Sequence, residues 1–306
     1  AAYAIIAYQT AYLKAHYPHE FFAASMSTEL SNQNKLSEFH EELKRLDINI
    51  IRPDINNCYA DFKSDGKNFY YALGALKNVG FDAISNVVNE RINNGLFISL
   101  KDFIKRVNPK DINKLQLEGL VKAGVFDKLN DNRQSIYNSI PNIILHSKNI
   151  FENELANQND LFNNEEDEND NILEEIEDWK FEERLSKEFQ TLGFFMSDHP
   201  LNQFKNLYEE FKIKNYSEFK LINEVKEINI AATVLKVQEK KTQKGNSYAI
   251  VKFSDLNSVF ELFIFSDTLE LNRELLVEGN SLLITLNKNS NDEENRFRRI
   301  NVKKIV

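Results

Sequence analysis

The chain has 306 residues, of which 42% are hydrophobic and 28% are charged, and this length suits two or three globular domains. The single cysteine, Cys58, excludes an internal disulfide, and no cluster of cysteine and histidine indicates zinc, so we expect a reducing, cytoplasmic setting. The apolar start of the chain stops short of the ~20 residues that span a membrane and lacks the pattern of a signal peptide, so no membrane association is expected.

Net charge argues at first against a nucleic-acid ligand, because the formal charge is −9. Its distribution matters more, since the stretch from Asp160 to Glu183 contains Lys180 as its only basic residue and supplies the whole negative excess. The flanking parts of the chain are close to neutral or mildly basic. Their surfaces can therefore still be locally positive.

The first part of the chain is predicted to be mainly helical. Residues 1–52 carry apolar side chains at helical spacing, with a break at Pro18. Residues 62–71 differ, because Asp65 and Gly66 separate two aromatic-rich runs and glycine readily takes the positive φ of a tight turn. We therefore predict a β-hairpin there, followed by short helices.

The second part is predicted to contain helices, an acidic linker and then strands. Residues 130–150 and 179–196 have helical patterns, whereas the acidic, Asn-rich stretch 157–171 lacks the periodicity of a core-forming segment. One or two short helices are expected over 201–222. Five strand-like runs follow, with a helix before the fourth, at residues 228–235, 248–253, 259–265, 281–286 and 296–306. This is the layout of an OB barrel.

These elements predict an α+β, multidomain fold, in which an α-helical region with a helix-hairpin-helix element precedes a five-stranded OB-fold β-barrel. The expected segments are a helical one at 1–60, a hairpin domain at 61–150, an acidic flexible linker at 151–178, a further helical segment at 179–222 and the barrel at 226–306.

Residues 73–88 have the layout of a helix-hairpin-helix element, in which two helices flank a turn of small residues. Backbone amides at the start of the second helix can hold a DNA phosphate, and the candidate contacts are Lys77, Asn78, Val79 and Gly80. The usual hairpin has glycine on both sides of the apolar residue. Asn78 replaces the first glycine here, and asparagine tolerates the left-handed conformation better than most residues.

A second, looser copy of the hairpin lies at 120–127, where Lys122 and Gly124 are the candidate DNA contacts. Two such hairpins would together grip the DNA backbone without reading its sequence. The alternative for these segments is a helical packing turn that binds no ligand.

The acidic linker contains a short motif with an aliphatic and an aromatic residue, formed by Gln158, Asp160, Leu161 and Phe162. Nothing local could cover Leu161 and Phe162, so we expect them to fill a hydrophobic pocket of a partner while Gln158 binds polar groups at its rim. The alternative is that Phe162 packs back on its own domain.

The start of the predicted barrel is rich in lysine. The candidate contacts for single-stranded DNA are Lys236, Lys240, Lys241, Lys244 and Tyr248, with Phe253 and Phe263 nearby. OB folds stack bases on aromatic rings and follow phosphates with basic side chains. Alternatively, the aromatic residues of these strands belong to the core and the lysines are only solvated.

No catalytic residue is assigned. The chain has no Walker, GxSxG or HExxH motif, and its acidic residues lie in a linker instead of on the rigid strands that two-metal phosphoryl transfer needs. The five histidines are scattered along the chain. We therefore expect neither a metal ion nor another cofactor in this chain.

Several runs closely resemble the alpha subunits of bacterial DNA polymerase III, the replicative C family. The most specific is the opening AAYAIIAYQTAYLKAHYP, which resembles part of the fingers domain of that family. Similar runs occur in the same order at residues 52–56, 122–127 and 192–201. The resemblance covers essentially the whole chain.

This resemblance implies a chain that runs from the end of the fingers domain through a clamp-binding hairpin domain to the OB domain, with residues 158–162 binding the sliding clamp. It implies a parent enzyme that polymerises DNA with Mg²⁺ on aspartates of a palm domain upstream of Ala1, and a segment beyond Val306 that binds the tau subunit of the clamp loader. Duplex and single-stranded DNA would be the other partners. By itself, the chain is expected to be unable to polymerise.

Both ends of the chain lie inside predicted elements, so we expect a piece of a larger protein. Two other functions fit the same residues: a stand-alone DNA-repair or accessory module with tandem hairpins and an OB fold, and an RNA-binding OB appendage such as a tRNA synthetase carries. Affinities for primed duplex DNA and for structured RNA would separate these functions.

Overall fold

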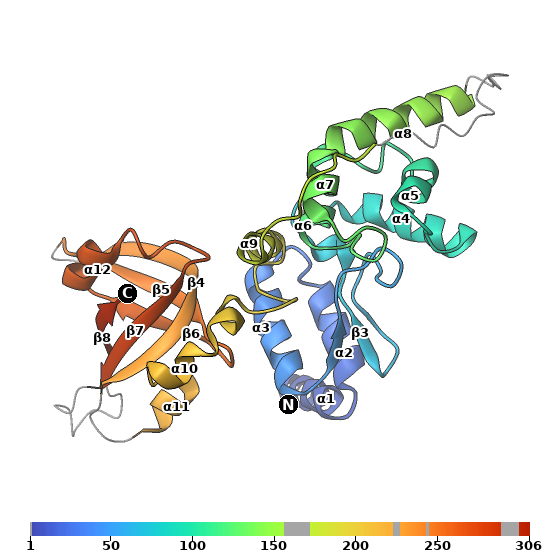
Figure 1. Cartoon of the computed structure of the whole chain (residues 1–306). Helices are drawn as coiled ribbons and strands as arrows, with labels where there is room; N and C mark the ends of the chain where they lie inside the picture. Colours follow the sequence, from blue (N-terminus) through green and yellow to red (C-terminus); the bar gives the residue numbers. More distant parts are fainter. Residues whose placement is uncertain (1, 156–171, 223–226, 243–244, 289–299) are drawn as a thin grey trace. The chain divides into compact units, whose positions relative to one another are not determined.

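The computed structural model describes residues 2–155, 172–222, 227–242, 245–288 and 300–306 (Figure 1). The chain divides into two compact units, Ala1–Met196 and Ser197–Val306. Each unit has a hydrophobic core of its own. The segment boundaries expected near residues 60, 150 and 178 all fall inside the first unit, and they remain predictions.

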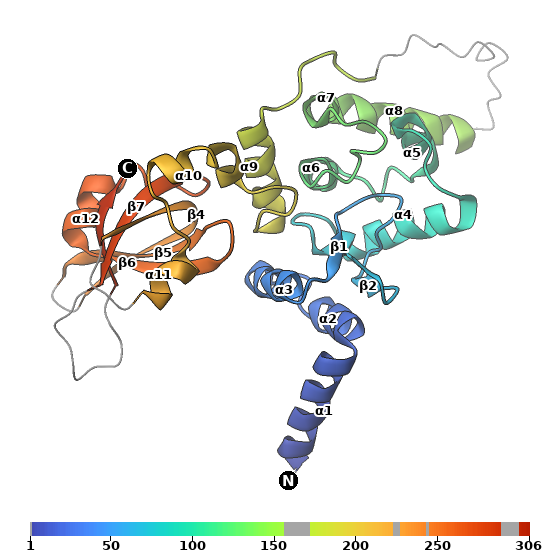
Figure 2. The ribbon, with the colours of Figure 1, turned by 60° about the horizontal axis from the view of Figure 1, so that its bottom comes forward.

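The first unit is mainly helical (Figure 2). Its helices are α1 Ala2–His16, α2 Pro18–Ser27, α3 Gln33–Arg45, the 3-10 helix η1 Leu73–Ala75, α4 Phe81–Asn94, α5 Leu100–Arg106, α6 Lys114–Lys122, α7 Arg133–Asn138, α8 Ile140–Leu155 and α9 Phe181–Leu192. The break at Pro18 is confirmed, because this proline opens α2, where a backbone N–H has no helical partner in any case. Gly193 ends α9 at φ +83°, a conformation that glycine takes easily.

Three short strands form a small sheet in this unit. Strand β1 (Asn49–Ile51) pairs in parallel with β3 (Asn68–Tyr70), and β2 (Lys63–Ser64) pairs with β3 in antiparallel fashion. Gly66 lies in the turn between β2 and β3 at φ +81°, so the predicted hairpin is confirmed. Strand β1 lies in a region that was predicted to be helical, so that prediction is wrong there. Its parallel pairing with β3 adds a strand to the hairpin.

An aromatic cluster joins this hairpin to helices that are distant in sequence. Phe62 and Tyr71 are buried and meet edge to face at 5.1 Å. Tyr71 also contacts Phe194, and Phe194 stacks on His40 of α3 at 4.2 Å. Residues from the beginning and the end of the unit therefore share one core.

The chain on both sides of residues 156–171 belongs to the first unit. Helix α8 ends at Leu155, and the chain that resumes at residue 172 runs along α7. The amide of Glu174 donates to Ser139 Oγ at 2.8 Å, and Asn132 Nδ2 donates to the carbonyl of Ile176 at 2.6 Å. The acidic segment predicted as a linker therefore leaves from and returns to the same unit.

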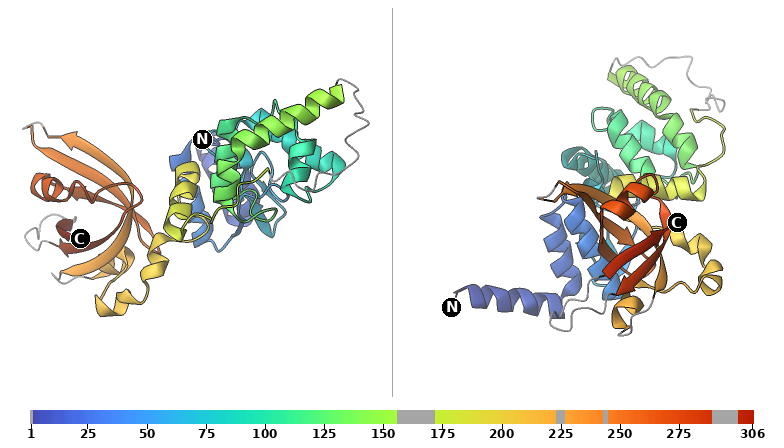
Figure 3. Two further views of the ribbon diagram at one scale, coloured as in Figure 1. Left: turned by 45° about the horizontal axis from the view of Figure 1, so that its top comes forward. Right: turned by 90° about the vertical axis from the view of Figure 1, so that its left-hand side faces the viewer.

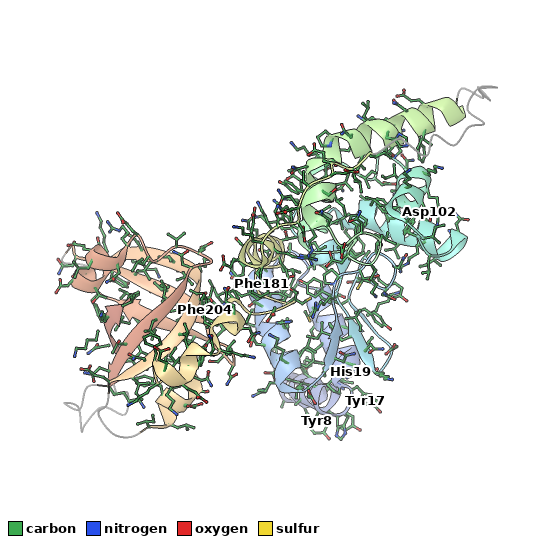
Figure 4. The ribbon with its side chains drawn as sticks, in the orientation of Figure 1. Tyr8, Tyr17, His19, Asp102, Phe181 and Phe204 are labelled. Atoms are coloured by element: carbon green, nitrogen blue, oxygen red, sulfur yellow. The ribbon has the colours of Figure 1, made fainter. Side chains whose placement is uncertain are left out.

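Helix α1 and the residue after it present large aromatic side chains to solvent. Tyr3, Tyr8 and Tyr17 are 89%, 70% and 53% exposed, and Figure 4 shows the last two at the surface. None of the helices in the described part of the chain is long and apolar enough to cross a membrane.

The second unit combines short helices with a five-stranded antiparallel sheet (Figure 3). Its elements are η2 Pro200–Phe204, α10 Leu207–Glu210, α11 Tyr216–Leu221, β4 Ile228–Lys241, β5 Ser247–Ser254, β6 Val259–Ile264, α12 Ser266–Asn272, β7 Ser281–Lys288 and β8 Ile300–Ile305. The predicted five strands, the helix before the fourth strand and the α+β class are confirmed.

The sheet has the order β6-β5-β4-β7-β8. The long strand β4 joins its two halves, because the first part of β4 pairs with β7 and the second part pairs with β5. Alternate side chains face the core, as in β7, where Leu282, Ile284 and Leu286 are buried. Among the described residues β6 and β8 are the edges, and no backbone pairing joins them. The sheet is therefore open here, and the closed OB barrel remains a prediction.

Candidate nucleic-acid interface

The turn between η1 and α4 has an unusual backbone conformation at its centre. Asn78 takes φ +68°, in the left-handed region, as expected for the residue that stands in place of the first glycine. Val79 is 8% exposed, whereas Lys77, Asn78 and Gly80 are all exposed. The apolar residue thus anchors the turn, and the polar groups beside it lie on the surface.

The start of α4 offers backbone amides to an anion. Gly80 is the N-cap residue, and no side chain caps the helix there. The amide of Ile84 makes the first bond of this helix, to the carbonyl of Gly80 at 3.0 Å, so the amides of residues 81–83 lack a partner within the helix. Such a terminus carries partial positive charge and favours a phosphate. The exposed carboxylate of Asp82, in the first turn, opposes this attraction.

Two other helices hold this turn in place. The amide of Lys77 donates to the carbonyl of Thr191 in α9 at 3.1 Å, and the same carbonyl accepts from Gln33 Nε2 at 2.9 Å. On the α6 side, Gly119 packs so closely that an added Cβ would lie 2.7 Å from the Lys77 carbonyl oxygen. The position of the turn therefore depends on α6 and α9 as well as on its own sequence.

The second candidate turn, at residues 120–127, has a different geometry. Gly124 takes φ +75° and is buried, and its amide donates to the carbonyl of Val121 at 3.0 Å. A Cβ at this position would collide with the guanidinium of Arg133, which in turn binds the Asp127 carboxylate at 2.7 Å. This geometry favours a packing turn, the alternative considered above, for Gly124. The side chain of Lys122 is partly exposed, and its Nζ lies 5.3 Å from the centre of the Tyr137 ring.

The residues of the predicted clamp motif, which are Gln158, Asp160, Leu161 and Phe162, lie outside the described part of the chain. Their flanks are described, and both are fixed on the first unit through the contacts of α8 and of residues 172–180.

One face of the strands β4 and β5 brings together three of the residues predicted to bind single-stranded DNA, Lys236, Lys240 and Tyr248. Lys240 lies directly opposite Tyr248 across β4 and β5, and Lys236 lies opposite Lys252 on the same face. The Tyr248 ring is stacked near that of Phe263 in β6, with the ring centres 6.5 Å apart. Lys241 is exposed at the end of β4, and Lys244 lies outside the described residues.

Lys252 is a residue of this face that the sequence did not indicate, whereas Phe263 was expected near Tyr248. Both lie with Tyr248 on the side that points away from the core, and Phe263 is 51% exposed. Phe265, directly after β6, is 56% exposed. Phe253 faces the other way and is fully buried. The period of two along a strand separates these faces, but it does not say which of them the core will cover.

Two features of the titratable side chains in the described residues concern metal binding and nucleophilic reactivity. Within those ranges no three His, Cys, Asp or Glu side chains lie together in a way that could hold a metal ion. Burial raises the pKa of the Cys58 thiol to about 12, which keeps it protonated and unreactive.

Comparisons with known proteins agree with this geometry. Residues 47–136 match the family described as a helix-hairpin-helix motif, and this range contains both candidate turns. The DNA polymerase III subunit alpha of Caulobacter vibrioides is 34% identical over 299 residues, which are 97% of this chain and 26% of that protein. The subunit alpha of Borreliella burgdorferi is also 34% identical, over 92% of this chain and 25% of its own length.

The chain thus spans about a quarter of the length of the curated relatives that it matches. Similarity of this strength extends over both units, because it covers nearly all of the 306 residues. The resemblance seen in the sequence is confirmed: over that quarter of its relatives' length, the chain is homologous to DNA polymerase III alpha subunits.

Proposed function

We propose that this chain is the DNA-holding part of a replicative DNA polymerase. The observation that carries the proposal is the uncapped start of α4, where the exposed residues Asn78 and Gly80 lie beside Lys77 inside a region that matches the helix-hairpin-helix motif. A phosphate of duplex DNA would accept hydrogen bonds from the free amides of α4, and the Lys77 ammonium would add charge. Contacts of this kind hold DNA without reading its sequence.

The proposal extends to the whole replicase through the relatives. In the longer protein, Mg²⁺-dependent synthesis of DNA would take place on a palm domain, and this chain would keep the newly made duplex in line with it. The replicase would work in the cytoplasm, and a further segment would bind the tau subunit of the clamp loader. This chain would bind DNA without polymerising it.

The acidic segment would bind the sliding clamp through Leu161 and Phe162, with Gln158 and Asp160 beside them. Support comes from its attachment, since both flanks are fixed on the hairpin-containing unit and the motif would therefore stay near the duplex. Titrating a bacterial sliding clamp with the chain and with the double variant Leu161→Ala, Phe162→Ala tests this part. Equal clamp affinity of the two proteins would remove the assignment.

The open face of the sheet would hold single-stranded template. Support comes from the partly exposed Tyr248 and the exposed Phe263, whose rings can stack on bases, and from Lys236 and Lys240 on the same face, which can follow phosphates. An OB fold would use its sheet in the same way.

Duplex binding by the hairpin is tested with three variants of the chain and a fluorescent duplex. Lys77→Gln should weaken binding to duplexes of any sequence and reduce the slope of log affinity against log salt by about 0.9, the value for one phosphate contact. Asp82→Asn should strengthen binding, because it removes the carboxylate that opposes a phosphate at the start of α4.

The matched control is Lys101→Gln, which removes one exposed lysine from α5 and leaves the hairpin unchanged. It should keep the slope of the unmodified chain. If the Lys77 and Lys101 variants have the same affinity and the same slope, the hairpin does not carry the phosphate contact.

A further inference from the structure

Four segments of the first unit bring two lysines to the same aromatic ring, that of Tyr137, and one of them also to Trp179. Lys122 ends α6, Tyr137 lies on α7, Trp179 precedes α9, and Lys187 lies on α9; Figure 2 shows these three helices side by side. Lys122 Nζ is 5.3 Å and Lys187 Nζ is 5.8 Å from the centre of the Tyr137 ring. Lys187 Nζ is also 5.4 Å from the Trp179 ring. These four residues are called the Tyr137 cluster below.

Two carboxylates near the cluster are each paired with a lysine. Lys187 pairs with Glu183 at 3.7 Å, but the Glu183 side chain is 51% exposed, and such surface pairs contribute little. Burial and the charge of Glu118 raise the pKa of Tyr137, and Glu118 itself lies 3.9 Å from Lys114. Both ammonium groups near this ring would attract a phosphate that approaches the cluster.

The cluster lies next to the hairpin turn. Thr191, whose carbonyl accepts from the Lys77 amide, follows Lys187 by four residues, or about 6 Å along α9. Gly119, which packs against the Lys77 carbonyl, precedes Lys122 by three residues, or about 4.5 Å along α6. In both α6 and α9, the residue that contacts Lys77 and the lysine of the cluster are therefore separated by about one turn of the helix.

We propose that Lys122 and Lys187 form a second contact for the phosphates of duplex DNA beside the hairpin turn, and that the Tyr137 and Trp179 rings hold both ammonium groups in position. The proposal rests on the DNA-binding function proposed above, and it adds Lys187, which no sequence motif had indicated. A free lysine side chain loses rotamer entropy when it binds a phosphate. Contact with the ring faces restricts the two lysines beforehand and lowers that loss.

The test measures duplex affinity of the full chain between about 50 and about 200 mM salt, where each phosphate contact adds about 0.9 to the salt slope. Lys187→Gln should reduce the slope by about 0.9, so that the ratio of the wild-type to the variant affinity falls about threefold across this range. Lys187→Arg should restore the slope, since it keeps the charge and the ring contact. Lys101→Gln remains the control.

Two further measurements distinguish phosphate contact from a purely structural role of the cluster. If the lysines contact phosphates, the following results are expected. Tyr137→Leu keeps both charges but removes the ring that both lysines contact, so it should lower affinity at every salt concentration without changing the slope. Lys187→Gln should leave the thermal unfolding temperature within the error of the unmodified chain. A lower unfolding temperature together with an unchanged slope would make Lys187 a packing residue and overturn the proposal.

The outcomes separate this inference from the function on which it rests. A slope reduced by Lys77→Gln and unchanged by Lys187→Gln keeps the hairpin and rejects the second contact. The reverse result supports the second contact and rejects the hairpin assignment. A chain that binds no duplex at low salt rejects both.

Discussion

Gly119 offers the sharpest test of how the hairpin turn is held. An alanine there would place its Cβ 2.7 Å from the carbonyl oxygen of Lys77 and 3.2 Å from Cγ2 of Val79, whereas an ordinary contact begins at 3.4 Å. The carbonyl is backbone and cannot rotate away, so α6 and the turn would have to separate. Overpacking of this kind typically costs about 1–3 kcal/mol.

An opposing term comes from helix propensity. Alanine is better than glycine in a helix interior by about 1 kcal/mol, and Gly119 lies inside α6. The net loss of stability should therefore be about 0–2 kcal/mol, which corresponds to a fall of up to about 8 °C in the unfolding temperature of a unit of this size. Because the turn moves with Lys77, duplex affinity should fall more than stability does.

The assay combines thermal unfolding, followed by circular dichroism, with duplex binding for Gly119→Ala and for Gly80→Ala. In the second variant the new Cβ would meet the end of the Gln116 side chain at 3.2 Å, and this side chain can move aside. Gly80→Ala should therefore be the more stable of the two. If Gly119→Ala is more stable than the unmodified chain and binds duplex equally well, the turn is not packed on α6 as described.

Further predictions follow from single side chains. Asn78→Gly should leave stability nearly unchanged, whereas Asn78→Val should lose about 1–3 kcal/mol in thermal unfolding, because a β-branched residue is strained at the φ of +68°; equal stability of the two would contradict this conformation. Tyr248→Ala should weaken single-strand binding by about 1–3 kcal/mol with the fold intact. Phe253→Ala, in the core, should instead unfold the second unit at a lower temperature. If Tyr248→Ala lowers the unfolding temperature and Phe253→Ala weakens single-strand binding, the core lies on the opposite face of the sheet. Burial lowers the pKa of His40, so the folded state binds its proton less readily than the unfolded chain does. The neutral ring therefore contributes fully to the free energy of unfolding above the ordinary pKa near 6.5, and this contribution is lost as the pH falls below it. His40→Leu should make the free energy of unfolding of the first unit less dependent on pH over that range.

The β2–β3 hairpin shows how far the local sequence determines the backbone conformation. Asp65 and Gly66 between aromatic runs predicted the β2–β3 turn, and the structure places Gly66 at φ +81°. Asn78 in a glycine position likewise predicted a left-handed residue in the turn between η1 and α4. In both cases steric clashes restrict the φ angle of a single residue, and this restriction depends only on the type of that residue.

Packing between different elements decided the rest of the site. Gly124 has the same signal as a DNA-binding turn, but the guanidinium of Arg133 occupies the space beside it. Nothing near Lys187 in the sequence indicates a ligand, and its place beside Lys122 arises because α7 and α9 pack on α6. No local pattern encodes such a meeting.

The sequence by itself determined the order and type of most elements, the break at Pro18, both left-handed turns and the family, because periodicity and turn chemistry act within a few residues. Only the tertiary structure decided which face of the five-stranded sheet is covered and which lysines meet over Tyr137. Burial of apolar surface is a property of the whole unit, and it depends on contacts that the chain makes only after it has folded.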